Sequence, residues 1–109
     1  MKYSNYDIGG TIVRQDDRYI VKDNSELKKL VVSSTTLHAG KSTSGHSHAG
    51  QEEVYHFVFG QGEMELDENK FTVSSGDTVL INDGVFHRVH NIGNTDLHFI
   101  CVFDGSRNH

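Results

Sequence analysis

Proline and tryptophan are absent from this chain, and cysteine occurs once, as Cys101. With one cysteine no internal disulfide can form, and a structural zinc site built from several thiolates is excluded. In a chain without proline the turns are formed by Gly, Asn, Asp and Ser, and glycine is frequent here, with 11 residues among 109. Cys101 lies in an apolar, strand-like run at residues 99–103, where a free thiol is typical of a small buried hydrophobic residue.

Basic clusters and long apolar segments are also missing. Lys28 and Lys29 are the only adjacent basic pair, and the formal net charge is -5. Nucleic acids and anionic membranes are therefore not expected as partners. The N-terminus lacks the apolar segment of a signal peptide, and no apolar run approaches the length needed to span a membrane. We expect a cytoplasmic protein.

Short runs rich in Val, Ile, Phe, Tyr and Thr dominate the rest of the chain, separated by turn signals. Strands are predicted at residues 18–22, 30–37, 54–59, 63–66, 71–73, 78–81, 86–90 and 97–103. Residues 24–29 hint at one helical turn. Many short, evenly spaced strands predict an all-β sandwich or barrel, and the length corresponds to a single domain.

Two histidine-rich segments contain the residues that could bind a metal. His46 and His48 are one residue apart, so on a strand their side chains would point the same way. Glu53 follows five residues later, and a downstream segment adds His87 and His90. Three imidazoles and one carboxylate form an N/O ligand set for a divalent transition metal.

These residues lie at defined spacings within two separate blocks of the sequence. The first block contains two histidines and a glutamate between glycines, at Gly40, His46, His48, Glu53 and Gly60. The second block contains Gly76, Asn82, His87 and Asn91. The two blocks resemble the paired signature motifs of the cupin superfamily. That family normally has proline where this chain has Asn82, and Asn82-Asp83-Gly84 is itself a strong turn former.

The resemblance covers roughly residues 30–103 and implies an all-β fold, the cupin double-stranded β-helix or jelly-roll barrel. The barrel is expected at residues 18–109, with its signature motifs at 40–60 and 76–91. Residues 1–17 are expected to form an N-terminal arm or an added edge strand.

The resemblance also implies one divalent transition metal per chain (Mn, Fe, Co, Ni or Zn) inside the barrel. Its implied ligands are His46, His48, Glu53 and His87. Strand alternation then turns Tyr55, Phe57 and Phe59 inward with Glu53, and turns the competing carboxylate Glu52 away. By the same alternation, Val89 and Asn91 share the face of His87.

The remaining histidines are expected to have ordinary structural roles, because exposed or core-satisfied histidines are common. His56, His90 and His98 are placed on outer or unrelated faces, and His109 is terminal. For His38, just before the Gly40 turn, a structural role and a role in the site both remain open.

The strand at residues 54–59 is apolar on both sides, with Val54 and Val58 on the face opposite Tyr55. A strand with one solvated face would alternate apolar and polar residues. The outer face is therefore expected to be covered by the N-terminal arm or by a second subunit, and a homodimer is favoured.

Four protein ligands leave one or two open positions on an octahedral metal. The first functional prediction is a metal-dependent enzyme acting on a small polar oxygenated metabolite such as a sugar, as an isomerase or epimerase. The alternatives are an Fe-dependent dioxygenase or metal-assisted lyase, and a non-catalytic metal- or sugar-binding module. Tyr55 is the candidate catalytic acid or base. A phosphate anchor would need inward basic residues, but Arg88 has outward parity and Lys41 lies in a loop, which weakens a sugar-phosphate substrate.

Overall fold

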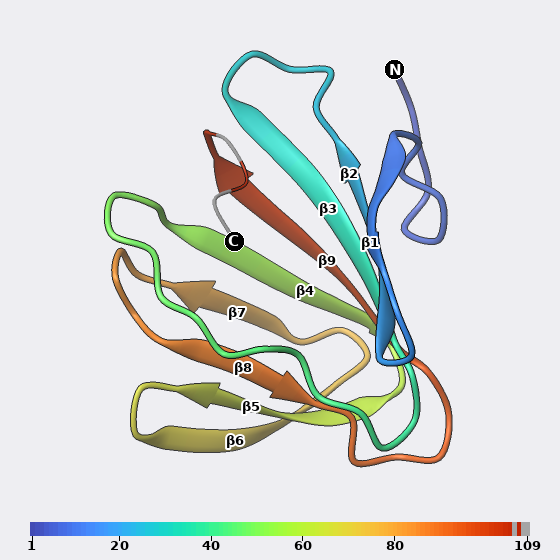
Figure 1. The fold of residues 1–109 in the computed structure, drawn as a ribbon, viewed down its shortest axis with the longest axis vertical. Coiled ribbons are helices and arrows are strands. Elements are labelled where there is room, and N and C mark those ends of the chain that lie inside the picture. The colour runs from blue at the N-terminus through green and yellow to red at the C-terminus, as the bar shows by residue number, and fades with distance from the viewer. Residues whose placement is uncertain (106, 108–109) are drawn as a thin grey trace.

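The computed structural model describes residues 1–105 and 107, and all of their regular structure is β-strand (Figure 1). The strands are β1 (Thr11–Gln15), β2 (Tyr19–Asn24), β3 (Leu30–Leu37), β4 (Glu53–Phe59), β5 (Gln61–Leu66), β6 (Asn69–Ser74), β7 (Thr78–Ile81), β8 (His87–His90) and β9 (Leu97–Asp104). Each strand predicted from the sequence is present, with bounds shifted by a few residues at most. His109, expected at the terminus, lies outside the described residues.

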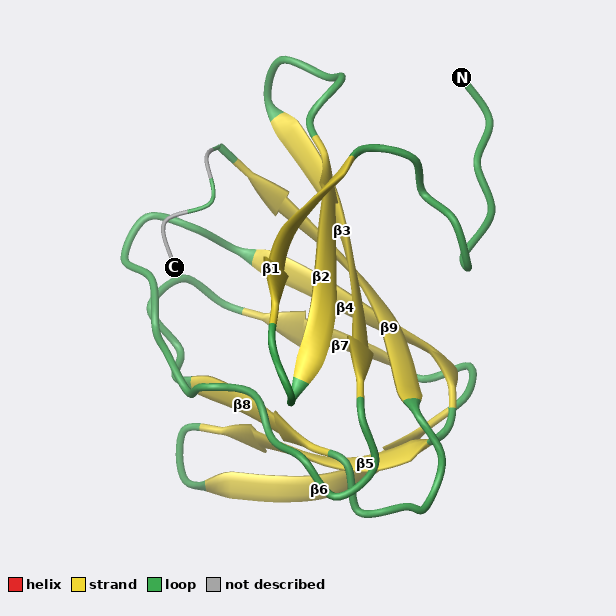
Figure 2. Ribbon diagram, turned by 45° about the vertical axis from the view of Figure 1, so that its right-hand side comes forward, coloured by secondary structure: helices red, strands yellow, loops and turns green. Residues whose placement is uncertain are grey.

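The strands form two sheets that face each other as separate layers (Figures 1 and 2). The six-stranded sheet has the order β1-β2-β3-β9-β4-β7, and the three-stranded sheet has the order β6-β5-β8. All the strand pairs are antiparallel. Neighbours distant in sequence, such as β3 with β9 and β4 with β7, close a jelly-roll barrel. The predicted all-β jelly-roll fold is confirmed.

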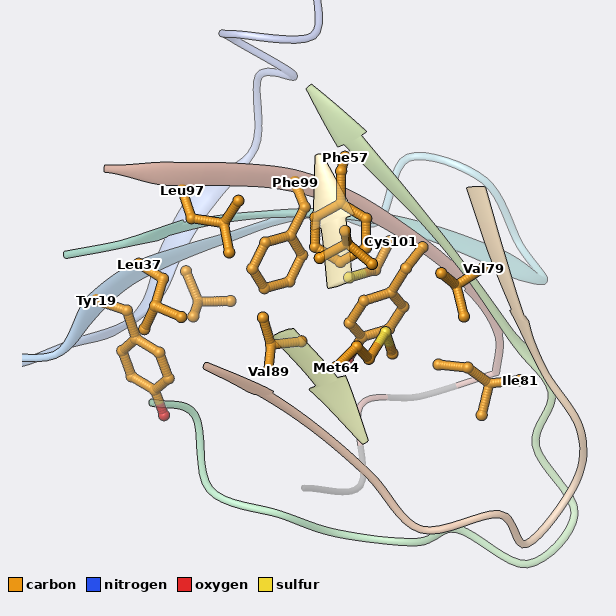
Figure 3. Close-up of a cluster of buried hydrophobic side chains, with 13 residues drawn as sticks. Tyr19, Leu37, Phe57, Met64, Val79, Ile81, Val89, Leu97, Phe99 and Cys101 are labelled. Atoms are coloured by element: carbon orange, nitrogen blue, oxygen red, sulfur yellow. The ribbon is translucent and has the colours of Figure 1, made fainter. Parts of the chain in front are cut away.

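The core lies between the two sheets. Phe57 and Phe99 come from the six-stranded sheet and meet Met64 and Val89 from the three-stranded sheet (Figure 3). All four side chains are buried, and burying one such side chain contributes about 1.5–3 kcal/mol. The free thiol of Cys101 is buried in the same cluster, which confirms its assignment as a small hydrophobic residue.

One inward position predicted on β4 is wrong. Tyr55 and Phe57 point into the core, but Phe59 is 48% exposed. The register between β4 and β9 shifts between Phe57, which pairs with Phe99, and Phe59, which pairs with His98. A bulge inserts one residue into the strand and reverses the alternation beyond it, so Phe59 turns outward.

The helical turn suggested at residues 24–29 is also absent. Asn24 is the last residue of β2, and residues 25–29 form the bend that leads to β3. The Asn24 side chain donates to the Ile8 carbonyl and accepts from the Glu26 backbone N–H. Because a single isolated turn is costly to nucleate, these side-chain bonds prevail over helix formation.

The N-terminal residues add to the edge and outer surface of the six-stranded sheet. β1 pairs with β2 at the sheet edge. Before it, the Asn5 carbonyl accepts a hydrogen bond from His98 Nε2, and the Tyr6 ring stacks on the His98 ring. The boundary between residues 17 and 18 stays a prediction. Among the described residues there is no helix with the length and apolar character needed to span a membrane.

Candidate metal centre

The segment between β3 and β4 runs alongside β8 (Figure 1, green). Its backbone pairs with that strand through Thr43 N–H to Val89 O and through two bonds between His46 and His87 (2.9, 3.2 and 2.9 Å). His46 and His87 form an antiparallel bridge, and bridged residues project their side chains to the same face. The His-x-His pair was predicted on a strand, but it lies in the loop between β3 and β4, and the bridge aligns His46 with His87.

The loop that carries His48 is tied to the turn before β8. The His48 carbonyl accepts a hydrogen bond from the Gly84 N–H (2.9 Å), and the Gly50 N–H donates to Asp83 Oδ1 (2.6 Å). Gly50 has a φ of 84°, a conformation that glycine adopts without strain. These bonds hold His48 next to the strand that begins with His87.

Three imidazoles and one carboxylate meet at this point of the barrel. One ring nitrogen from each of His46, His48 and His87 lies within 4.8 Å of the others. Glu53 opens β4 and is 3% exposed, and its Oε2 lies 3.5 Å from His87 Nε2. Glu52, the competing carboxylate, is exposed. The structure thus groups His46, His48 and His87 and places Glu53 against His87, and their role as metal ligands stays a prediction.

The hydrogen bonds around His87 and Glu53 fit a cation between them. His87 Nδ1 lies 3.1 Å from the Val85 carbonyl, which can only accept, so Nδ1 carries a proton and Nε2 is the ring nitrogen left to bind a cation. Nε2 faces the Glu53 carboxylate, and Glu53 Oε1 has no hydrogen-bond partner among the described residues. Buried lone pairs that face one another need a shared positive centre.

Burial favours the neutral form of the imidazoles. Burial, together with the neighbouring His87 and His48 rings, lowers the pKa of His46 to about 4. Burial also lowers the pKa of His48. Both rings are therefore neutral near pH 7, which is the form that binds a metal.

Tyr55 lies two residues after Glu53 and contacts the cluster. Its ring stacks on Phe99 at a centroid distance of 5.3 Å and meets the His87 ring edge-on at 5.7 Å. Burial raises the pKa of the phenol well above its usual range, and the adjacent Cys101 thiol adds to the effect. Tyr55 therefore keeps its proton at neutral pH and can donate a hydrogen bond.

The other described histidines lie outside the cluster. His56 bonds to Thr78, His90 bonds to Ser42 and Glu65, and His98 bonds to Thr36 and Asn5. His38 pairs with Asp96 and follows Leu37, which is opposite Leu97 on β9, whereas Glu53 is opposite Phe103. Six residues of strand separate the two positions, about 20 Å, so His38 is remote from the cluster.

A cavity of about 50 Å³ adjoins the cluster at His46 and Glu53. Ser33, Thr35, Thr43 and Ser44 line it, together with Arg14 and Arg107. The sequence reasoning considered Arg88 and Lys41 as basic groups and missed both of these arginines. Arg88 instead donates to the Thr43 carbonyl and supports the loop. Alternation could not place Arg14, which follows a strand irregularity, or Arg107, which follows the last strand.

The chain belongs to the cupin family. The cupin domain profile matches residues 33–103. An uncharacterized protein of Methanocaldococcus jannaschii is 34% identical over 94 residues, which cover 76% of this chain and 75% of that protein. An oxalate-binding protein of Thermotoga maritima is 33% identical over 66 residues, covering 61% of this chain and 54% of that protein. The second match thus spans about half of that relative's length.

A solved structure supports the fold assignment. An uncharacterized Klebsiella pneumoniae protein with a double-stranded β-helix domain superposes with a TM-score of 0.81 and covers 94% of this chain and 88% of that chain. The two sequences are 18% identical, so this likeness concerns the fold alone. Fold by itself does not choose among the chemistries that one architecture supports.

Proposed function

We propose that the chain holds one divalent transition metal and binds a small polar oxygenated metabolite beside it. The proposed ligands are His46, His48, Glu53 and His87. The observation that carries the proposal is the buried approach of His87 Nε2 to Glu53 Oε2, 3.5 Å apart, with two more imidazoles beside them. A proton on His87 would satisfy that pair alone, whereas a metal cation satisfies the whole set.

A metal held by these residues would supply Lewis acidity or, as iron, redox chemistry. The chain itself contributes three further features. The Val85 carbonyl fixes the His87 tautomer, the hydroxyl-lined cavity offers hydrogen bonds to an oxygenated ligand, and the protonated Tyr55 phenol lies against His87. We assign Tyr55 the role of a proton donor to bound substrate.

The reaction class that we favour is isomerisation or epimerisation of a sugar-like metabolite, as the motifs suggested. Oxidation by an Fe-dependent dioxygenase and metal-assisted elimination are the alternatives, followed by a non-catalytic metal- or sugar-binding module. Oxygen uptake on adding candidate substrates to the iron-loaded protein separates the oxygenase from the isomerase. Tight ligand binding without turnover supports the module.

A small carboxylate is a second candidate ligand class. One relative is named as an oxalate-binding protein and is 33% identical over the matched segment. Arg14 and Arg107, which line the cavity, also support a carboxylate ligand, because arginine pairs well with carboxylates.

Metal content after purification without a metal-affinity tag tests the centre. Wild-type protein is expected to contain about one divalent metal per chain, and His46→Ala combined with His48→Ala is expected to abolish it, because two of four donors are lost. His90→Ala is the matched control, since His90 bonds to Glu65 and Ser42 away from the cluster. Full metal content in the double variant, measured by elemental analysis, would refute the proposed centre.

We also propose that the protein is a cytoplasmic homodimer. The N-terminal residues contact the outer face near His98. Val54 and Leu80, on the outer face of β4 and β7, remain 38% and 70% exposed. A second copy would cover this apolar area.

A further inference from the structure

The cavity beside the histidine cluster lies on the inner side of the six-stranded sheet. Tyr19 and Val21 of β2 line it from that sheet, and Ser44 and His46 line it from the loop along β8. Glu53 lines it as well, so any ligand in this cavity lies next to the proposed metal ligands. The inference below rests on the proposed metal centre and takes up the second ligand class named above, a small carboxylate.

An irregularity in β1 directs Arg14 toward this cavity. Ile12 pairs with Lys22, but Arg14 pairs with Val21, so two residues of β1 span one step of β2. Without this bulge Arg14 would be opposite Ile20, on the outer face. Cross-strand partners share a face of the sheet, and Val21 is buried and lines the cavity. The bulge thus turns Arg14 inward, as bulges next to functional sites often do.

Arg14 is the uncompensated positive charge of the cavity wall. The other guanidinium, that of Arg107, forms a bidentate pair with Asp23 at 2.6 and 2.8 Å. Among residues 1–105 and 107, no side chain forms a hydrogen bond or ion pair with Arg14, although Arg14 lines the cavity. With a divalent metal on three neutral imidazoles and Glu53, the cavity carries net positive charge, which favours an anion.

We propose that the ligand of this site is a small carboxylate anion and that Arg14 binds it. The planar guanidinium offers paired N–H donors that match a carboxylate. Size restricts the class further, because a water needs at least about 10–15 Å³ measured in this way. A cavity of about 50 Å³ therefore favours a small ligand. Among carboxylates, oxalate suits this volume better than citrate.

Calorimetric titration of oxalate into metal-loaded protein tests the proposal, with glycerol as a neutral probe of the same size and citrate as a larger anion. We expect oxalate to bind and the other two to bind at least tenfold more weakly. Arg14→Gln is expected to weaken oxalate binding by about tenfold to a hundredfold, since hydrogen bonds to charged groups contribute about 1.5–3 kcal/mol. Arg14→Lys is expected to lose less affinity than Arg14→Gln, because lysine keeps the positive charge but lacks the paired N–H donors of the guanidinium.

Two further variants separate direct contact from net charge and from folding. Lys28→Gln removes one positive charge at an exposed position in the bend between β2 and β3 and is expected to leave oxalate affinity unchanged. Deletion of Val13 removes the bulge but leaves Arg14 opposite Val21, on the cavity face, so oxalate binding is expected to be retained. Arg14 is exposed on an edge strand, so Arg14→Gln is expected to keep the wild-type melting temperature and metal content.

The outcomes distinguish this inference from the metal centre. Equal oxalate affinity in wild type and Arg14→Gln, or tighter binding of glycerol than of oxalate, overturns the anion site and leaves the metal centre standing. Wild-type protein without metal overturns the proposed centre, and the comparison of Arg14→Gln with wild type is then made in metal-free protein, where it still decides the role of Arg14.

Discussion

Tyr55 is the residue where packing and chemistry are hardest to separate, since its ring fills the core while its hydroxyl lies beside Cys101. Tyr55→Phe keeps the ring and removes only the hydroxyl. Metal content is expected to be unchanged, and the free energy of unfolding is expected to change by about 1 kcal/mol or less.

Activity is the property that we expect Tyr55→Phe to change. If the phenol acts as proton donor, kcat for a substrate identified by screening falls about 10²–10⁴-fold at unchanged metal occupancy. Elemental analysis and steady-state kinetics on the same preparation make the comparison. Full activity in the variant would remove Tyr55 from the mechanism.

His46 makes the metal-free protein sensitive to acid. Its pKa is lowered to about 4 in the folded state, whereas in the unfolded chain it is about 6.5. Between these values the unfolded chain binds more protons than the folded one, so the free energy of unfolding falls as the pH falls from about 6.5 to about 4. Chelator-treated protein is expected to lose melting temperature across this window.

The comparison variant for this effect is His46→Ala. It lacks the titrating group, so its melting temperature is expected to depend less steeply on pH between about 6.5 and 4. Identical pH profiles for wild type and His46→Ala would show that another group causes the acid sensitivity.

Among the connecting elements, the turn between β7 and β8 positions two of the proposed metal ligands. The Asn82 carbonyl accepts from the Val85 N–H (3.1 Å), and the Gly84 N–H donates to the His48 carbonyl. Gly84 has a φ of 79°, which an L side chain adopts only with strain. The turn thus connects the His48 loop to the start of β8.

Asn82→Pro is expected to keep the fold and the metal. Proline often precedes or begins turns, and its effect on the unfolded chain is expected to stabilise the protein by several tenths of a kcal/mol. Gly84→Ala, at the positive φ, is expected to destabilise it by about 1 kcal/mol. Denaturant unfolding measures both, and a loss of more than about 2 kcal/mol in Asn82→Pro would mean that the Asn82 N–H makes a needed bond.

At the scale of the whole molecule, an apolar row crosses the outer face of the six-stranded sheet. Val32 pairs with Val102, Val102 pairs with Val54, and Val54 pairs with Leu80, across β3, β9, β4 and β7. Val54 and Leu80 are the most exposed of the four. Burial of the row against a second copy would remove this apolar surface from water.

Leu80→Glu tests the dimer. Wild-type protein is expected to elute as a dimer in size-exclusion chromatography with light scattering. The variant is expected to be monomeric, because a charge at the centre of an apolar contact is costly to desolvate. Leu80 is 70% exposed, so the fold of the subunit should be retained, and Glu68→Gln at an exposed position is the control. A monomeric wild type would contradict the prediction.

The sequence alone predicted the fold class, most strand positions and the three histidines that cluster, with Glu53 beside His87. It did so because strand alternation and turn chemistry are local properties, and because the two motifs keep chemically meaningful residues at fixed spacing. Glu53 and Glu52 are one residue apart, yet alternation already separated the inward carboxylate from the exposed one.

The tertiary structure alone decided the features that depend on register. The bulge in β4 turns Phe59 outward, and the bulge in β1 turns Arg14 inward. The loop that carries His46 takes its alignment from hydrogen bonds to β8, more than 40 residues away. A bulge shifts alternation by one residue, and only the pairing partner shows where that shift occurs. Strand alternation in the sequence therefore could not show that Arg14 faces the cavity.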